Sequence, residues 1–458
     1  MVEVEKWGST GRMKSFRIHD LMRDLCLFKA QEENFLQFVD LRNRDEPVES
    51  VSFGTKTNVK PRNKVRRVAI YANHHVSDLL PFIDNGEGSL RCLIFVNRGV
   101  EPRKQVFKPL FNRFRMLRVL NLDNMLTPSF SGKLPKEIGK LIHLRLLSLD
   151  NSNVESIPSS IGNLSCLQTL NLAARMKRWE VPNVMWKLQQ LRHLYLPMSY
   201  HVSGKCLRLT NVSNLQTLLV VPTKYLDVND FQQLTNLKKL GICVDKNIGR
   251  IFHNPPSVRF NCVRSLHVHN EEEDMIDIIP VILSYPQIYK LELWSPIIKL
   301  PEDYQFSPNL MKLVLGDTYL KDDPMSTIEK LPNLRVASIR RYCFKGNEMV
   351  CSKGGFPRLE LLEFFAVFKL KEWKVEEGAL PSLCHLRIRS CRKLSRVPDG
   401  LRYVTTLKKI EIENMPREFI TRVEEGGEDL YKVQHVPSIV TFAEEDIRDT
   451  SSDTEDES

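Results

Sequence analysis

Apolar residues recur along the chain in one short pattern. They occupy the first, fourth and sixth positions of six-residue segments such as Leu144 to Leu149, and polar residues fill most of the positions between them. Fifteen of these segments lie between Val65 and Ile412, with their first positions 22 to 27 residues apart. An amphipathic helix would instead repeat its apolar positions with a period of 3.6 residues over a longer run. The pattern therefore predicts a series of short strands separated by connecting segments.

This spacing is typical of leucine-rich repeats, whose units are about 20 to 29 residues long. A single unit cannot bury its apolar strand face, so neighbouring units stack and share one continuous core. The predicted fold class is α/β: a leucine-rich-repeat solenoid, a horseshoe with a parallel concave sheet, over residues 61–415. We expect a C-terminal cap over residues 416–443. Residues 444–458, with eight acidic residues and one arginine, are expected to form a disordered acidic tail.

Several connecting segments share the sequence Leu-Pro-x-x-Ile-Gly-x-Leu or a close variant of it. Two copies begin at Leu134 and Ile157, and a weaker copy begins at Val181. Proline fixes φ and lacks an N–H donor, which places these segments on the convex side rather than in the sheet. They resemble the cytoplasmic plant type of leucine-rich repeat. After Tyr200 the connecting segments vary in length and composition.

The first forty residues follow a different pattern. Residues 16–18 predict a short extended segment, and a helix is expected to begin at Asp20, a residue type that favours the helix N-cap. Leu21, Leu25 and Phe28 then follow at the spacing of one helix face. This predicts a strand and an amphipathic helix before the repeats.

Ile18, His19 and Asp20 resemble the MHD motif that closes the nucleotide-binding module of plant intracellular immune receptors, the coiled-coil NB-ARC leucine-rich-repeat disease-resistance proteins. The resemblance continues through residues 33–36, 64–70, 114–122 and 425–435, so it covers nearly the whole chain. It implies that residues 1–40 are the C-terminal remnant of an NB-ARC winged-helix subdomain. Residues 41–60 would then form a linker to the repeats.

The same resemblance implies a cofactor role for two residues. In a receptor with the full NB-ARC module, His19 would lie near the β-phosphate of bound ADP, and Asp20 would orient the neighbouring subdomain. The alternative is that both residues cap the helix. Residues 8–15 imitate a phosphate-binding loop, but Met13 stands where that loop needs its second glycine. We therefore expect no cofactor for the chain alone, and ADP or ATP only within a full-length receptor.

Composition and motifs argue against several classes of protein. Apolar residues make up 42% of the 458 residues, but no run is long enough to span a membrane. No secretory signal and no catalytic motif are found, so we expect neither a secreted protein nor an enzyme.

His267 and His269 share a strand face without a third ligand at suitable spacing, so no metal site is expected. Cys243, Cys262 and Cys384 are expected to pack as small apolar residues, and the scattered cysteines favour a reducing, cytoplasmic location, with the plasma-membrane surface and the nucleus left open.

The residues that alternate with the core leucines should face the concave side. In the early repeats they are small and polar, as at Asn121, Asp123, Ser148, Asp150 and Asn171. In the later repeats they are basic and aromatic, which is typical of residues that anchor interfaces. A solvated face without a partner is the alternative. The predicted partner-binding residues are His193, Tyr195, Lys239, His267, His269, Lys290, Trp294, Lys312, Arg340, Phe365, His385, Arg387, Arg389 and Lys409.

The chain carries a net charge of +10, but no motif for reading bases accompanies it, so nucleic acid is not an expected partner. The resemblance implies a non-catalytic recognition and autoinhibitory module of a plant innate-immune receptor. Its expected partners are a pathogen effector or a guarded host protein, and the NB-ARC module of the same molecule. The alternative is a stand-alone leucine-rich-repeat scaffold or adaptor for protein–protein interaction.

Overall fold

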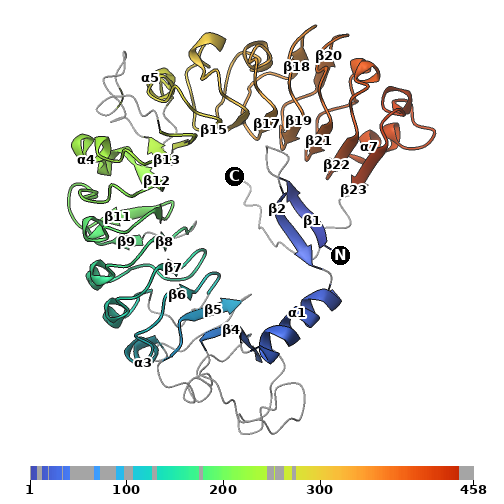
Figure 1. Cartoon of the computed structure of the whole chain (residues 1–458). Helices are drawn as coiled ribbons and strands as arrows, with labels where there is room; N and C mark the ends of the chain where they lie inside the picture. The colour runs from blue at the N-terminus through green and yellow to red at the C-terminus, as the bar shows by residue number, and fades with distance from the viewer. Residues whose placement is uncertain are drawn as a thin grey trace, which may run out of the picture. The chain divides into compact units, whose positions relative to one another are not determined.

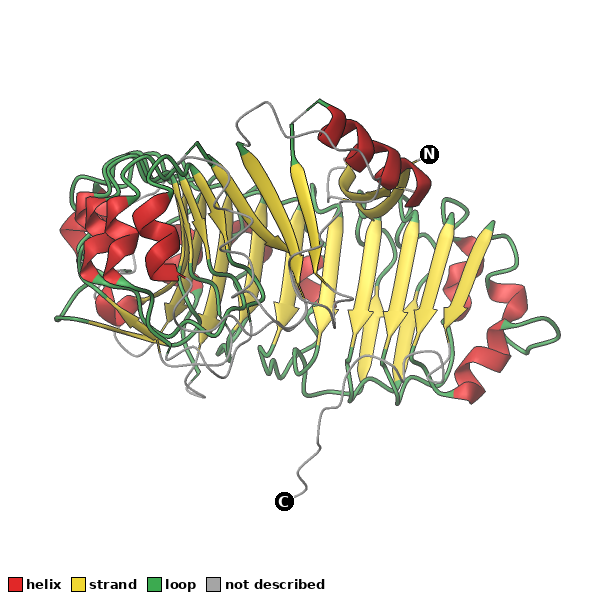
Figure 2. Ribbon diagram, turned by 90° about the horizontal axis from the view of Figure 1, so that it is seen from below, coloured by secondary structure: helices red, strands yellow, loops and turns green. Residues whose placement is uncertain are grey.

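The computed structural model describes residues 2–7, 13–18, 20–33, 35–41, 66–72, 89–96, 107–125, 132–174, 179–244, 252, 262–270 and 275–442. The chain divides into two compact units, Met1–Lys239 (unit 1) and Leu240–Ser458 (unit 2). Each unit is described by itself below. Figure 1 gives the element labels, and Figure 2 shows the strands.

Unit 1 begins with a two-stranded hairpin and a helix. Strand β1 (Val2–Trp7) pairs antiparallel with β2 (Met13–Ile18), and helix α1 (Asp20–Glu32) follows. The predicted strand and helix are confirmed. The apolar stripe of α1 faces solvent in this chain, because Leu21, Phe28 and Leu25 are 74%, 57% and 50% exposed.

The main sheet of unit 1 is parallel, and its strands pair in chain order. Its first strand spans the boundary that we expected at residue 40, so residues 37–41 belong to the repeat sheet. The strands are β3 (Gln37–Leu41), β4 (Arg67–Ala72), β5 (Cys92–Val96), β6 (Val119–Asn121), β7 (Leu146–Ser148), β8 (Thr169–Asn171), β10 (His193–Tyr195) and β12 (Thr217–Pro222).

Short helices connect these strands on the convex side. Pro135 and Pro158 stand immediately before η3 and η4, where a missing N–H donor leaves no hydrogen bond unmade. Asp227 caps α4 by accepting hydrogen bonds from the N–H groups of Asn229 and Asp230. The connecting elements are α3 (Phe107–Arg113), η3 (Lys136–Lys140), η4 (Ser159–Asn163), η5 (Met185–Lys187), η6 (Thr223–Tyr225), α4 (Val228–Gln232) and the parallel pair β9 (Trp179–Val181) and β11 (Tyr200–Val202).

Unit 2 continues the same repeat. Parallel pairing in chain order runs from β14 to β23, so one strand of the predicted cap joins the sheet. The strands are β13 (Lys239–Val244), which begins at the unit boundary, β14 (Ser265–Asn270), β15 (Lys290–Trp294), β16 (Lys312–Gly316), β17 (Val336–Arg340), β19 (Leu361–Phe365), β21 (His385–Arg389), β22 (Lys409–Glu413) and β23 (Ser438–Phe442).

The convex side of unit 2 is more varied than that of unit 1, as the sequence predicts. Its elements are α5 (Ile279–Leu283), η8 (Asp303–Gln305), α6 (Met325–Ile328), η9 (Asp399–Tyr403), the parallel pair β18 (Glu348–Cys351) and β20 (Glu372–Val375), and the capping elements α7 (Arg417–Val423) and η10 (Leu430–Lys432).

The core confirms the apolar pattern. Its positions in the described residues are at most 9% exposed, with one exception. The pattern predicts Val220 as a core residue, since it holds the third apolar position of the segment that begins at Leu215. Its φ is 61° and it is only half-buried, whereas Val221 is fully buried. The left-handed residue turns the backbone within β12, so the next inward side chain comes one position later. The leucine-rich-repeat fold class is confirmed. Val65 lies outside the described residues.

The expectation for the cysteines is only partly correct. Cys243 is buried, Cys384 is half-buried, and Cys262 is exposed because it stands in a turn one residue before its repeat's first core position. No helix among the described residues is long and apolar enough to cross a membrane.

Candidate functional site

The candidate site is the inner face of unit 2, which consists of the side chains that alternate with the buried ones along β14 to β22. Strand pairing aligns these side chains into rows, since Trp294 lies opposite Gly316 and Arg340 lies opposite Phe365. Eleven of the fourteen predicted partner-binding residues lie here. They are His267, His269, Lys290, Trp294, Lys312, Arg340, Phe365, His385, Arg387, Arg389 and Lys409.

The middle row of this face contains glutamates that are not among the predicted partner-binding residues. Glu292, Glu363 and Glu411 each stand between the second and third core positions of their repeats. That shared position is the signal that would have found them. With Glu413, they set four carboxylates against six lysines and arginines on this face. The face expected to be basic is therefore a mixed-charge surface with a small excess of positive charge.

The first ion-pair cluster surrounds Glu292. Its Oε2 atom lies 2.9 Å from Nδ1 of His267, and its Oε1 atom lies 2.5 Å from Nζ of Lys290. Burial raises the pKa of Glu292, but the hydrogen bond from His267 and the charge of Lys290 lower it by more. The carboxylate is therefore ionised throughout the physiological pH range.

A second cluster surrounds Glu411. This carboxylate accepts a hydrogen bond from Nε of Arg387 and lies 2.6 Å from Nζ of Lys409. Burial raises its pKa, but these two cations outweigh that effect and lower it overall. Nε of Arg389 lies 2.9 Å from Oε2 of Glu413. The arginines at this end of unit 2 are therefore held in fixed positions.

Between the clusters lies a platform formed by Arg340 and two aromatic rings. The guanidinium carbon is 5.7 Å from the Trp294 ring centre and 5.5 Å from the Phe365 ring centre, within the range of cation–π attraction. Arg340 also donates hydrogen bonds to Oγ of Ser338 at 2.9 Å and to Oε2 of Glu363 at 3.0 Å.

Glycine at position 316 leaves room for the Trp294 ring, because a Cβ atom there would come within 2.6 Å of the indole. Nε1 of Trp294 is buried and has no hydrogen-bond partner among the described residues. Nε1 of the core residue Trp179 is likewise buried without a partner among the described residues, so this atom does not by itself mark a binding site.

Two histidines of this face carry little charge near pH 7. Burial lowers the pKa of His269 and His385, so these imidazoles are neutral there, and burial likewise lowers the pKa of His193 in unit 1. The described residues include no group of three or more His, Cys, Asp or Glu side chains arranged to hold a metal ion.

The other predicted site residues lie in unit 1. His193 and Tyr195 are on β10, where Nδ1 of His193 lies 3.1 Å from Oγ1 of Thr217, and Lys239 is the first residue of β13. His19 lies outside the described residues. Asp20 is the first residue of α1, and its side chain also lies outside the described part. The ADP role of this pair stays a prediction.

On the inner face of unit 1, near β6 and β7, small polar residues form a hydrogen-bond network around Asp123. Its Oδ1 atom accepts a hydrogen bond from Oγ of Ser148 at 2.5 Å and another from the N–H group of Asp150 at 2.9 Å. Its Oδ2 atom accepts a hydrogen bond from the side-chain amide of Asn121 at 2.9 Å. These small residues satisfy one another.

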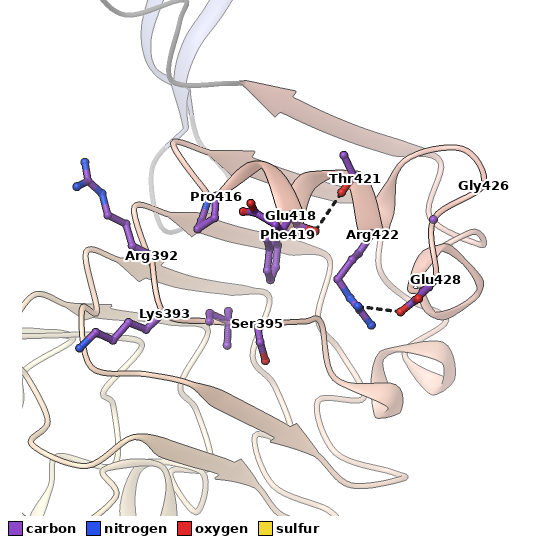
Figure 3. A pocket seen from close by; sticks show the side chains of 12 residues that line it. Arg392, Lys393, Ser395, Pro416, Glu418, Phe419, Thr421, Arg422, Gly426 and Glu428 are labelled. Carbon is purple, nitrogen blue, oxygen red and sulfur yellow. Dashed lines mark hydrogen bonds and ion pairs between the residues drawn. The ribbon is translucent and has the colours of Figure 1, made fainter.

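A pocket of about 600 Å³ lies at the C-terminal cap, between the turn at residues 392–395 and helix α7 (Figure 3). Arg422 lines it, but Glu428 at 2.8 Å and the buried Asp429 at 2.9 Å already pair with this guanidinium. Lys432 lies 2.8 Å from the same aspartate. These ion pairs hold the cap together and leave the inner face as the better candidate site.

Comparisons with known proteins place the chain among repeat proteins. A family model described as a leucine-rich repeat region matches residues 91–433. Disease resistance RPP8-like protein 3 of Arabidopsis thaliana is 34% identical over 96% of this chain and 47% of its own length. Disease resistance protein RPP8 of the same plant is 36% identical over 93% and 46%. The chain thus spans about half the length of these relatives.

A solved leucine-rich-repeat protein of Leptospira interrogans is 17% identical, with a TM-score of 0.45 over 82% of this chain and 89% of that one.

Proposed function

The chain belongs to the leucine-rich-repeat family, and from that premise we propose that it is the recognition and autoinhibitory part of a plant disease-resistance receptor. In this role it carries out no catalysis. The inner face of unit 2 binds either a pathogen-derived or guarded host protein, or the remaining part of the receptor itself. Both partners act in the cytoplasm in this proposal. The relatives named as disease-resistance proteins support the biological role.

The platform of Arg340, Trp294 and Phe365 is the observation that carries this proposal. Interface energy concentrates in tryptophan, tyrosine and arginine side chains that are held rigidly and surrounded by a polar rim. The two ion-pair clusters supply such a rim, and their mixed charges give a partner many points of electrostatic discrimination. Because the arginines are already fixed, binding would lose little side-chain entropy.

Competition of two partners for one face would switch the receptor between an autoinhibited and a released state. If the external protein and the rest of the receptor use the same platform, they exclude each other, and recognition releases the autoinhibited module. The exposed apolar stripe of α1, at Leu21, Leu25 and Phe28, supports packing against a further domain and favours the receptor over a stand-alone scaffold.

The test is association with the part of RPP8-like protein 3 that lies outside the matched region. We expect the chain to co-purify with it. Trp294→Ala should weaken the association by about tenfold or more, as expected for a hot spot. The paired swap Arg389→Glu with Glu413→Arg keeps the ion pair but reverses the surface charges, and it should also weaken binding.

The matched region of RPP8-like protein 3 itself serves as the positive control for this experiment. Asn171→Ala, on the inner face of unit 1, serves as the control variant and should leave association unchanged. Association that survives both inner-face variants of unit 2 would refute the site. Association of the matched region of RPP8-like protein 3 but not of this chain would favour the scaffold alternative.

A further inference from the structure

A second surface follows the edge of the unit 2 sheet. The strands are parallel and point the same way, so the turns after β16, β17, β19 and β21 share one edge (Figure 2). Three consecutive turns place Tyr319, Tyr342 and Phe368 there, each 36% to 46% exposed. The Tyr319 and Tyr342 rings stack at 5.7 Å with a 7° angle between their planes, and Phe368 lies 5.6 Å from Tyr342. We call these three residues the aromatic edge.

The backbone of the aromatic edge is unusual for its residue types. Tyr319 and Tyr342 both have a φ of 50°. In the corresponding turns of other repeats, Asn124, Asn151 and Asn414 take this left-handed conformation, which asparagine tolerates and bulky residues rarely adopt. Strained residues persist where their side chains serve a purpose. Phe356 and Leu380 also have a positive φ but are fully buried, so it is the exposure and stacking of the two tyrosines that point to a binding role for this edge.

Lysines lie near the aromatic edge, and Asp317, in the same turn as Tyr319, pairs with Arg341 at 3.5 Å. Nζ of Lys345 lies 5.9 Å from the centre of the Tyr319 ring. Lys369 follows Phe368 directly, and Lys393 occupies the next turn along the edge; both are exposed. In the described part of the chain, no carboxylate lies within ion-pair distance of Lys369 or Lys393. Aromatic rings next to unneutralised lysines suit an extended segment that is rich in acidic residues.

The chain contains such a segment, and it starts at this edge. Strand β23 is parallel to β22, and the N–H group of Asn414, in the turn after β22, donates a hydrogen bond to the carbonyl of Phe442 at 3.1 Å. Residues 444–458 follow Phe442 almost directly and carry eight acidic residues and one arginine. Four strand spacings of about 4.8 Å separate β23 from β17, or about 19 Å. Sixteen extended residues reach about 50 Å.

We propose that the acidic segment 444–458 binds along the aromatic edge of unit 2, with its carboxylates near Lys369 and Lys393 and its backbone against the tyrosine rings. The segment is then a built-in competitor for any acidic partner of this edge. This inference stands apart from the proposed function, because it concerns a different surface and an occupant within the same chain.

Single-stranded nucleic acid is the other occupant that combines aromatic and basic contacts. The geometry favours the acidic segment, because Tyr319 and Tyr342 stack on each other and leave no gap between them for a base. Binding of a nucleic acid is therefore an outcome that the experiment must be able to show.

The experiment uses a fluorescein-labelled synthetic peptide of residues 443–458 and measures its anisotropy with the full-length chain. The wild type is compared with a full-length variant whose eight tail acids are changed to Asn or Gln. The variant should bind the peptide about tenfold more tightly, because the tethered segment no longer competes at high effective concentration. The affinity should fall as salt rises from about 0.05 M to 0.5 M, as screening requires.

Edge variants are then made in the neutralised-tail chain. Tyr342→Asn suits the left-handed backbone and should preserve the fold, which circular dichroism and thermal unfolding would verify. It should weaken peptide binding by about tenfold, as should the pair Lys369→Glu and Lys393→Glu. Tyr304→Asn, at a tyrosine that is 80% exposed in η8, and Lys408→Glu, just before β22, are the matched controls and should have no effect.

Two results would overturn the proposal. One is equal peptide affinity for the wild type and the neutralised-tail chain, which would mean that the tethered segment does not occupy the site. The other is unchanged peptide affinity in the Tyr342→Asn and the double lysine variants. A third result would also contradict it: a labelled single-stranded oligonucleotide that binds more tightly than the peptide and loses this binding in Tyr342→Asn. That result would assign the edge to nucleic acid.

Discussion

The inner faces of the two units share one backbone pattern and differ in what they offer to a partner. Around β6 to β8 in unit 1, Asp123, Ser148 and Asn121 use their polar groups on each other. Across β15 to β19 in unit 2, the Arg340 platform presents half-buried aromatic and cationic side chains. The difference shows that core leucines specify the repeat, while the alternating positions are free to carry function.

This separation has a physical cause. Side chains on a strand point alternately to opposite faces, so the core positions and the inner-face positions are chosen independently. Leu170 in unit 1 and Leu386 in unit 2 are both fully buried on parallel strands. The residues beside them are Asn171 and Arg387. A polar network of small residues stabilises locally, whereas long charged side chains extend toward solvent and toward partners.

Truncation of equivalent core leucines should have the largest effect on stability, and the loss should be similar in the two units. Leu170→Ala and Leu386→Ala should each destabilise the chain by about 3 kcal/mol, because each removes buried methyl groups and leaves a cavity. Thermal unfolding by calorimetry would measure both. A cost in one unit more than twice that in the other would contradict the claim of a common core.

Removing one carboxylate from each inner face should show how much each unit depends on charge for its stability. Glu411→Gln should destabilise by about 2 kcal/mol, because it leaves Arg387 and Lys409 close together without their shared anion. Asp123→Asn should destabilise by about 1 kcal/mol, since its partners are neutral donors. Urea unfolding midpoints would rank the two variants. The reverse order would mean that unit 1 depends more on charge than unit 2.

Acid should weaken unit 2 through the same carboxylates. Hydrogen bonds and nearby cations hold the pKa of Glu292, Glu411 and Asp429 below their usual values, despite burial. A carboxylate with a lowered folded-state pKa contributes its full stability above its unfolded pKa of about 4 and loses it as pH falls through the folded value. The melting temperature should therefore drop below about pH 4. Glu411→Gln should make that drop smaller, and an unchanged slope would contradict the assignment.

Periodicity in the sequence located the core because burial depends only on a residue's position within its own repeat. Val220 departs from it because one left-handed residue displaces the inward side chain to Val221, and no local pattern signals that turn. The sheet also continues through β23, which falls within residues 416–443, the range expected to form the cap.

The candidate site was harder to predict than the core. Arg340, Trp294 and Phe365 were selected one at a time, but their contacts join side chains from different repeats, so they depend on strand register. Glu292, Glu363 and Glu411 were not predicted, because an excess of basic and aromatic residues at the alternating positions does not reveal the acidic residues among them. Alignment of the repeats on their core positions would have shown all three. The stacking of Tyr319 on Tyr342 depends on turn geometry, which periodicity does not describe.

The most direct test of the central claim is hydroxyl-radical footprinting of the chain, read by mass spectrometry, with and without the part of RPP8-like protein 3 outside the matched region. The account predicts that oxidation of Trp294 and Phe365 falls about fivefold or more on binding, because an interface core excludes water. Met116, an exposed residue of unit 1, should react at the same rate in both states. Protection of Met116 together with unchanged oxidation of Trp294 and Phe365 would contradict the assignment of the inner face of unit 2 as the binding surface.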